Sequence, residues 1–301
     1  MSINRIKHLS IKLKSNFYFN YNSSKLSWFR CGGLIDIYCL VENEQELKIL
    51  LENLEDSPYF VVGAGSNLLI RDGGYRGTII KLGKSFNNMQ LREDKIYTGG
   101  AVLDVNLSKF ALNNSISKLE FYSGIPGSIG GAVKMNAGCF GSQTMDVLSE
   151  VSIITKRGIK KNLKKEQLDF SYRNSNLSKN DIVTLAIFHA KFDNKVKIKD
   201  NINEIKIKRR QSQPIKNKTG GSTFKNPKGY SAAKLIEEAN CKGLMIGDAI
   251  VSEKHSNFLI NTNKATSKNI EELGNEIKER VLKKFNINLD WEIKIIGDNI
   301  E

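Results

Sequence analysis

The hydrophobic positions in the first two thirds of the chain follow the periods of strands. β-branched and aromatic residues bounded by turn formers predict strands at residues 34–41, 59–62, 77–82, 95–98, 147–155 and 181–191. Within 181–191, Val183, Leu185 and Ile187 alternate with smaller or polar neighbours. Between the first two strands, Leu47, Leu50, Leu51 and Leu54 fall at helical spacing, so residues 43–54 are predicted to form a short amphipathic helix. Asn43 and Glu46 at its start have the spacing of a capping box.

The pattern changes beyond about residue 200. A polar linker with Gly and Pro at residues 211–221 leads to two predicted helices. The first follows Ser231 as N-cap, ends at Gly243 and buries Ala232, Leu235, Ile236 and Ala239. The second follows Ser267 and carries Ile270, Leu273, Ile277, Val281 and Phe285 at intervals of three and four.

A last strand is predicted at residues 288–296. Leu289, Trp291, Ile293 and Ile295 share one face of it, so Glu292 and Lys294 point from the other. The elements together predict an α+β fold in three consecutive parts: a segment at 1–57, a strand-rich domain at 58–200 and an α+β domain at 201–301.

Composition excludes a membrane-spanning protein. Hydrophobic residues make up 40%, the mean hydropathy is −0.34, and no apolar run approaches the roughly 20 residues that cross a bilayer. Residues 1–20 mix Lys, Arg, Asn and Ser throughout, unlike a secretory signal. We therefore expect a cytoplasmic protein without membrane insertion.

The charge leaves the partner open. Lys plus Arg is 46 and Asp plus Glu is 32, a net charge of +14 that would suit a nucleic acid, an anionic surface or a polyanionic substrate. The basic residues are spread along the chain. The one dense stretch, residues 195–218, lacks the interleaved aromatic residues of a single-strand binder. The abundance of Lys, Asn and Ile is typical of a compositional bias, so we expect no nucleic-acid partner.

The cysteines do not predict a metal site. Cys31, Cys39, Cys139 and Cys241 are far apart and form no CxxC pair, and the chain has only three histidines. We expect reduced thiols that act as small buried hydrophobic residues.

Two glycine-rich loops are the candidate binding elements. VGAGSNLL at 62–69 directly follows a predicted strand, and SGIPGSIGGA occupies 123–132. Glycine lets backbone N–H groups converge into a concave anion site that fits a pyrophosphate, although each loop alone could be a set of tight turns. The spacing excludes a Rossmann fingerprint, because Leu68 stands where a third glycine is needed. No P-loop and no G-x-S-x-G elbow is present.

Five motifs occur in a characteristic order: WFRCGG at 28–33, GAGSNLL at 63–69, YSGIPGSIGGAVKMNAG at 122–138, SYRNS at 171–175 and GGSTFKNP at 220–227. Their order and spacing resemble the UDP-N-acetylenolpyruvoylglucosamine reductases (MurB family) from about residue 15 to Gly297. The second glycine loop and the FKNP motif are the specific parts, whereas GAGSN is similar across a wider class of flavoproteins. The segment between Arg173 and Gly220 is too short for the tyrosine-bearing loop of one branch, so the chain resembles the shorter, second type.

This resemblance implies a PCMH-type FAD-binding domain, to which residues 1–57 and 58–200 belong, and a substrate-binding domain at 201–301. It implies an oxidoreductase that uses FAD and NADPH to reduce the enolpyruvyl ether of UDP-N-acetylglucosamine to UDP-N-acetylmuramate for peptidoglycan synthesis. A monomer acting on a small-molecule UDP-sugar is expected. Another FAD oxidoreductase with the same loops and a different substrate is the alternative.

The resemblance also assigns residues. Cofactor contacts are expected from Gly63, Ala64, Gly65, Ser66, Asn67 and Leu68 in the first loop, and from Ser123, Gly124, Ile125, Pro126, Gly127, Ser128, Gly130, Gly131, Ala132, Asn136 and Gly138 in the second. Tyr172, Lys225 and Asn226 are expected at the substrate, with His255 and Asn257 as further candidates. Arg173 and Glu292 look like the catalytic pair and Ser222 like the proton donor; no metal is implied.

The chemistry fits these roles. Hydride transfer to the β-carbon of an enolpyruvyl ether builds negative charge that spreads onto the carboxylate, so a cation and a hydrogen-bond donor must face it. Arg173 would supply the cation and a protonated Glu292 the donor. A positioned serine can protonate the strongly basic enolate. Without the resemblance, Arg173, Ser222 and Glu292 would read as residues of a loop, a turn and a solvent-facing strand.

Overall fold

The computed structural model describes residues 3–300 and divides the chain into two compact units. The first comprises residues 1–19, 37–64 and 77–207, and the second comprises 20–36, 65–76 and 208–301. This division differs from the three consecutive segments expected from the sequence, because the chain passes between the units several times before residue 80. The GAGSN motif is itself divided, with Gly63 and Ala64 in the first unit and the residues from Gly65 in the second.

The first unit contains two sheets. One has the strand order β1 (Asn16–Asn22), β2 (Leu34–Val41), β5 (Tyr75–Leu82), β3 (Tyr59–Val62), with β3 and β5 parallel. Helix α2 (Glu44–Leu54) buries its leucine face in a core that also contains residues of β2, β3 and β5, and α1 (Ile3–Ser10) adds Ile6. The alternation of aliphatic residues along β2 and β5 supplies the opposing surface.

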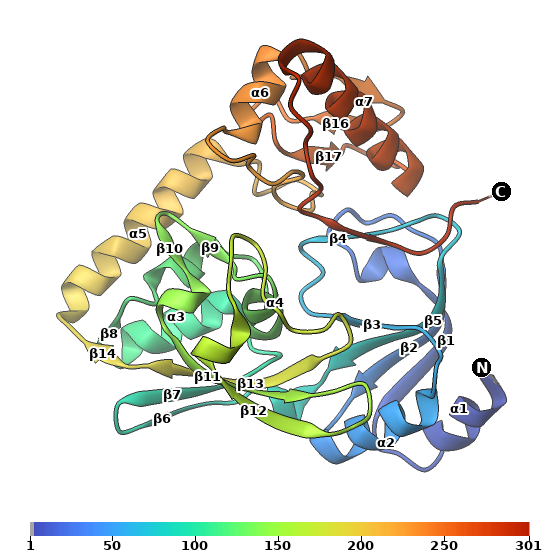
Figure 1. Cartoon of the computed structure of the whole chain (residues 1–301), viewed down its shortest axis with the longest axis vertical. Coiled ribbons are helices and arrows are strands. Elements are labelled where there is room, and N and C mark those ends of the chain that lie inside the picture. Colours follow the sequence, from blue (N-terminus) through green and yellow to red (C-terminus); the bar gives the residue numbers. More distant parts are fainter. Residues whose placement is uncertain (1–2, 301) are drawn as a thin grey trace. The chain divides into compact units, whose positions relative to one another are not determined.

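The other sheet of the first unit is antiparallel, in the order β12 (Lys160–Lys164), β11 (Leu148–Ile154), β13 (Ile182–His189), β7 (Lys95–Gly99), β6 (Met89–Arg92). Helices α3 (Asp104–Asn113) and α4 (Ile129–Lys134) pack on one face of it (Figure 1). Short pairs complete the unit: β8 (Ile116–Ser117) with β14 (Lys191–Phe192), and β9 (Gly138–Cys139) with β10 (Ser142–Gln143). Helix α5 (Lys195–Ser212) begins in this unit and ends in the second.

The second unit has its own core. Helices α6 (Ala232–Glu238) and α7 (Ser267–Phe285) pack with a three-stranded sheet of β15 (Met245–Ile246), β16 (Ala249–Val251) and β17 (Leu259–Asn261). Strand β18 (Lys294–Ile296) pairs in parallel with β4 (Leu68–Ile70). On α7, Ile270, Leu273, Ile277 and Val281 are fully buried. Within residues 3–300, no helix is both long and apolar enough to span a bilayer.

The structure confirms most predicted elements and corrects their ends. The helix at 43–54 and all six predicted strands are present, but 181–191 divides into β13 and the start of β14. Helix α6 ends five residues before Gly243, α7 is capped by Thr266 rather than Ser267, and the last strand shortens to Lys294–Ile296. Helix α5 occupies a basic stretch for which the hydrophobic pattern predicts no element. Cys31, Cys39 and Cys241 are buried as expected, and Cys139 is half-buried.

The start of α2 differs from the predicted capping box. The Asn43 side chain accepts a hydrogen bond from the Glu46 N–H at 3.0 Å, as expected. The Glu46 carboxylate turns instead to the segment before β1, where it accepts from the backbone N–H groups of Lys14 and Ser15 at 3.0 and 2.8 Å. Burial opposes the charge on Glu46, but the hydrogen bond from the Ser15 hydroxyl, together with these backbone bonds, outweighs it and lowers the pKa of the carboxyl. The carboxylate therefore fixes the segment before β1 onto α2.

A buried acid lies beneath the second glycine loop. Asp104, the first residue of α3, is fully buried, and its N–H donates to the Gly127 carbonyl at 3.1 Å. Burial raises the pKa of the Asp104 carboxyl well above its usual range, and the Gly127 backbone opposes this shift only in part. Within the described residues, neither carboxyl oxygen completes a hydrogen bond of normal geometry. We therefore expect Asp104 to be protonated in the folded protein.

This protonation predicts a pH dependence of stability. The unfolded Asp titrates near pH ~3.9, so between that pH and the raised native pKa the folded chain holds a proton that the unfolded chain has lost. The free energy of unfolding should fall with rising pH through this window, by up to about 1.4 kcal/mol per pH unit. Asp104→Asn should remove that contribution. Urea unfolding of both proteins across the window checks the difference, and equal slopes would contradict it.

Candidate cofactor and substrate sites

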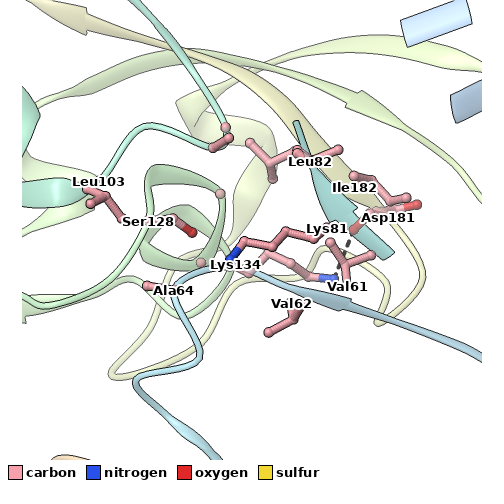
Figure 2. Close-up of a pocket in the computed structure, with 16 residues that line it drawn as sticks. Val61, Val62, Ala64, Lys81, Leu82, Leu103, Ser128, Lys134, Asp181 and Ile182 are labelled. Atoms are coloured by element: carbon pink, nitrogen blue, oxygen red, sulfur yellow. Dashed lines mark hydrogen bonds between the residues drawn. The ribbon is translucent and has the colours of Figure 1, made fainter. Parts of the chain in front are cut away.

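The first unit contains a pocket beside the start of the first glycine loop. It encloses about 120 Å³ and has apolar walls from β3, β5 and β13, including Val61, Leu82 and Ile182. Gly63, Ala64, Ser128, Gly130 and Gly131 also line it, and Ala64 and Ser128 lie on the side away from Asp181 and Ile182 (Figure 2). The pocket thus combines an apolar interior with two stretches of backbone that carry almost no side chains. Such a combination suits a planar ring joined to an anionic group.

The two glycine loops touch where this pocket begins. A Cβ built on Gly63 would lie 2.1 Å from the Ser128 Oγ, so only glycine permits this approach. The second loop is held from below by backbone bonds: the N–H of Ile129 donates to Val102 at 2.9 Å and that of Gly130 to Gly100 at 2.9 Å. The rim of the pocket is therefore fixed by strand ends rather than by mobile side chains.

Two lysines enter the pocket with different partners. The Lys134 ammonium group donates to the carbonyls of Ser178, Lys179 and Asp181 at 3.0, 2.9 and 2.9 Å, and so closes the turn before β13. Lys81 comes from the opposite wall, and its side chain extends from β5 across the pocket toward α4 (Figure 2). Neither lysine was among the residues singled out from the sequence.

The SYRNS segment is attached to the second glycine loop. The Arg173 guanidinium donates to the Gly138 carbonyl at 3.0 Å and lies over the Tyr172 ring, 5.0 Å from its centre. The fully buried Asn136 amide donates to the Ser171 carbonyl at 3.1 Å. Arg173 has φ +55°, a left-handed conformation that is uncommon for a residue with a side chain. Such strain is concentrated at functional sites.

The second unit places Ser222 and Glu292 on neighbouring backbone segments. The Glu292 N–H donates to the carbonyl of Thr223, the residue after Ser222, at 2.8 Å. Phe224 and Trp291 form a bridge next to this bond, and their rings lie 4.9 Å apart. Ser222 and Glu292 are both half-buried. The expected proton donor and the expected acid are thus held together by main-chain hydrogen bonds.

The second half of the GAGSN motif lies beside this pair. The Asn67 amide donates to the Glu292 carbonyl at 3.1 Å, and the Lys294 N–H donates to the Asn67 carbonyl at 3.0 Å. A Cβ on Gly221, which has φ +79°, would lie 3.8 Å from the Ser66 carbonyl. Within the second unit, the expected cofactor loop therefore adjoins the segments that carry Ser222 and Glu292.

Asn257 has a structural position rather than one at a cleft. Its side chain is 4% exposed; its Oδ1 accepts from the Phe224 N–H at 2.9 Å and its Nδ2 donates to the Phe224 carbonyl at 2.8 Å. It therefore holds the segment that carries Ser222. His255 packs edge-on against Phe258, and burial lowers its pKa. Asn257 thus positions the segment of a candidate residue. The neighbouring residues in the sequence did not indicate this role.

The three expected substrate residues differ in their surroundings. Lys225 is half-buried and its N–H donates to the Asp290 carbonyl at 2.9 Å. The Asn226 side chain is exposed, but its Oδ1 accepts from the N–H of Ala232 at 3.0 Å and so caps the start of α6. Tyr172 is 48% exposed beside Arg173.

Only some of the expected cofactor residues line the pocket. Gly63, Ala64, Ser128, Gly130 and Gly131 line it. Gly65 to Leu68 belong to the second unit, and Leu68 and Ala132 are 3% exposed, so their side chains pack inward. The other lining residues were not assigned to the cofactor by number, although Val62 and Lys134 lie within the quoted motifs: Val61, Val62, Lys81, Leu82, Gly100, Ala101, Leu103, Lys134, Asp181, Ile182 and Val183. Strand register, which pairs Val62 with Lys81, is the signal that would have found Lys81.

The pocket and the fold define a flavoprotein of the FAD-binding class: residues 35–163 match the FAD binding domain family. Residues 213–296 match the UDP-N-acetylenolpyruvoylglucosamine reductase, C-terminal domain family. The chain belongs to the family of UDP-N-acetylenolpyruvoylglucosamine reductases, since curated members are more than 40% identical over nearly all of it.

Two relatives and one solved structure illustrate this membership. The UDP-N-acetylenolpyruvoylglucosamine reductase of Caulobacter vibrioides is 46% identical over 90% of this chain and 91% of its own length. That of Rickettsia conorii is 41% identical over 95% and 97%. The crystal structure of UDP-N-acetylenolpyruvylglucosamine reductase (MurB) from Thermus caldophilus is similar, with a TM-score of 0.82, 33% identity, and coverage of 94% of this chain and 99% of that one. They favour this activity over a flavoprotein with another substrate.

Proposed function

We infer that this chain is an FAD-dependent oxidoreductase that uses NADPH to reduce UDP-N-acetylglucosamine enolpyruvate to UDP-N-acetylmuramate, a precursor of peptidoglycan. The observation that carries this inference is similarity to reductases of that name over 90% and 95% of the chain, at 46% and 41% identity. The two glycine loops and the pocket beside them supply what an FAD enzyme needs. The activity therefore rests on family membership, and the residue roles below are our proposals.

We propose that the pocket of the first unit receives the adenosine half of FAD. The apolar walls at Val61, Leu82 and Ile182 suit an adenine ring, and the glycine rims suit the diphosphate that follows it. The contact at Gly63, where a Cβ would meet Ser128, supports a cradle built for close backbone approach. When bound, the flavin supplies the hydride for the substrate after receiving one from NADPH.

We propose that Arg173 binds the enolpyruvyl carboxylate. A guanidinium can hold a carboxylate through two parallel hydrogen bonds and remains charged at every physiological pH. The bond to the Gly138 carbonyl and the contact with the Tyr172 ring limit the rotation of this long side chain. Such restraint reduces the entropy that Arg173 would lose on binding. Arg173 would thus stabilise the charge that develops on the carboxylate.

We propose that Ser222 donates the proton to the α-carbon and that Glu292, in its protonated form, donates a hydrogen bond to the carboxylate. The Glu292 N–H donates to the Thr223 carbonyl and so joins the segments that carry Ser222 and Glu292. This bond supports the proposal that the two residues are positioned together. Asn67 links the cofactor loop to the same segment. A serine hydroxyl is a weak acid, but an enolate is basic enough to take its proton, and water would then restore it.

We further propose that Tyr172, Lys225 and Asn226 bind the UDP-sugar, as the resemblance implies, with 201–301 as the substrate-binding part. Lys225 supports this because its charge suits a diphosphate. The capping role of the Asn226 side chain toward α6 makes its contribution indirect. We propose a cytoplasmic monomer that binds no nucleic acid. The dense basic stretch at residues 195–218 supports the latter, because it lacks interleaved aromatic residues.

Steady-state turnover tests the proposed activity. The purified chain with FAD should oxidise NADPH when UDP-N-acetylglucosamine enolpyruvate is present, and form one UDP-N-acetylmuramate for each NADPH consumed. Product is identified by its mass, two hydrogens above that of the substrate. NADPH oxidation that forms no UDP-N-acetylmuramate would point to a flavoprotein with a different acceptor.

A further inference from the structure

Lys81 is a cation inside the pocket that the roles above leave unused. It lies on β5, where its strand pairs in parallel with β3 and brings Lys81 opposite Val62, the residue before the first glycine loop. Its side chain is half-buried and lines the pocket together with Gly130 and Gly131. The register of two strands, rather than a flexible loop, therefore sets the position of this charge.

The charges around Lys81 do not neutralise it. Among the described residues, the Lys81 ammonium group makes no hydrogen bond and no ion pair. Lys134, the other cation of the pocket, donates to three backbone carbonyls. The one acid of the pocket, Asp181, accepts from the Ser178 N–H through its Oδ2 at 2.9 Å. Lys81 is therefore the cation of this pocket with its hydrogen-bond donors still available.

A half-buried cation that faces a glycine-lined rim is expected to have an anionic partner, because burial of an uncompensated charge is costly. Gly130 and Gly131 carry no side chain that could screen Lys81, and Gly63 marks the other rim. Apart from Asp181, the residues that line the pocket include no acid. A nucleotide phosphate meets these requirements, since it is anionic, approaches bare backbone closely and is covalently joined to a ring that fills the apolar walls.

We propose that Lys81 binds the diphosphate of FAD and sets much of the affinity of this chain for its cofactor. This proposal rests on the placement of FAD in the pocket proposed above and adds to it a residue outside both glycine loops. Lys81 holds the phosphate as a point charge from the β5 side, opposite the loop backbones. It acts on cofactor affinity and not on hydride transfer.

Fluorescence titration of the flavin-free full-length chain with FAD tests the proposal. Lys81→Met, which keeps the length of the side chain and removes its charge, should raise the Kd for FAD roughly ten- to a hundredfold. It should also weaken the dependence of Kd on salt concentration, because one charge pair is lost. Lys81→Arg should retain most of the affinity. Lys84→Met, the same change at an exposed residue three positions away, should leave the Kd unchanged.

Competition by ADP and by adenosine distinguishes the phosphate from the ring. Lys81→Met should raise the inhibition constant of ADP by a similar factor and leave the inhibition constant of adenosine unchanged, once each is corrected for the variant's own Kd for FAD. Equal weakening of both competitors would show that Lys81 contacts the adenosine and overturn the proposal, as would equal FAD affinity of Lys81→Met and Lys84→Met. A Gly63→Val variant that bound FAD with the affinity of the wild type would instead refute the placement of FAD itself. Thermal unfolding of the flavin-free Lys81 and Lys84 variants should match that of the wild type.

Discussion

Ser222→Ala should stop the second half of the reaction and spare the first. If Ser222 donates the proton, its removal slows substrate reduction by roughly 10² to 10⁴, or about 3 to 5 kcal/mol in the barrier. Reduction of the flavin by NADPH needs no proton from this residue and should keep its rate. Anaerobic stopped-flow absorbance separates the two half-reactions, because each changes the flavin spectrum.

The structure offers a matched control for this loss. Ser231 caps α6, and its hydroxyl accepts from the Lys234 N–H in the same unit. Ser231→Ala should cost about 1 kcal/mol of stability and leave both half-reactions intact. Equal slowing of both half-reactions in Ser222→Ala would indicate that the variant has lost its cofactor or its fold, and Ser222 would no longer qualify as the donor.

Gly63→Val should give a protein that is purified without bound flavin. A single Cβ at this position would stand 2.1 Å from the Ser128 Oγ and 3.2 Å from its Cβ, and valine adds two further methyl groups. The two loops would have to separate, at a cost of about 1 to 3 kcal/mol typical of overpacking. FAD affinity should therefore fall roughly ten- to a hundredfold or more. Flavin content after purification and titration of the flavin-free chain measure the loss.

A double-mutant cycle attributes this loss to the contact itself. Gly63→Ala alone should weaken FAD binding, because the new methyl group meets the Ser128 hydroxyl. Addition of Ser128→Ala removes that oxygen and should restore part of the affinity, so the two changes should not be additive. Additive losses would mean that the loops are not closed by this contact, and the cradle would have to be assigned elsewhere.

The sequence predicted the elements whose side chains alternate between core and solvent. The face of α7 from Ile270 to Val281 was visible because each turn places an apolar residue on one side. Helix α5 was not, since only Ile198 and Ile202 are buried among its many charged residues. The two glycines in α4 likewise mask a short helix that tertiary contacts with β13 stabilise. The hydrophobic pattern of a segment predicts an element only where that segment itself supplies the buried face.

The candidate sites likewise contain residues that the sequence predicted and residues that it did not. The glycine loops were predicted because a bare backbone requires glycine at fixed positions, as at Gly63. Lys81 and the apolar walls were missed, because they enter the pocket from strands whose register no single segment encodes. The adjacency of Ser222 and Glu292 depends on main-chain pairing between segments about seventy residues apart. The motifs indicated which chemistry to expect. The remaining walls of the pocket come from strands that are distant in the sequence and pair in the fold.

One measurement tests the central claim, that this chain transfers reducing equivalents from NADPH through FAD to an enolpyruvyl sugar nucleotide. The flavin-loaded chain is mixed anaerobically with a slight excess of NADPH, and its visible absorbance is followed. We predict that the absorbance bleaches, stays low in the presence of UDP-N-acetylglucosamine, and returns on addition of UDP-N-acetylglucosamine enolpyruvate. Absorbance that stays low after the enolpyruvyl substrate is added would contradict the account.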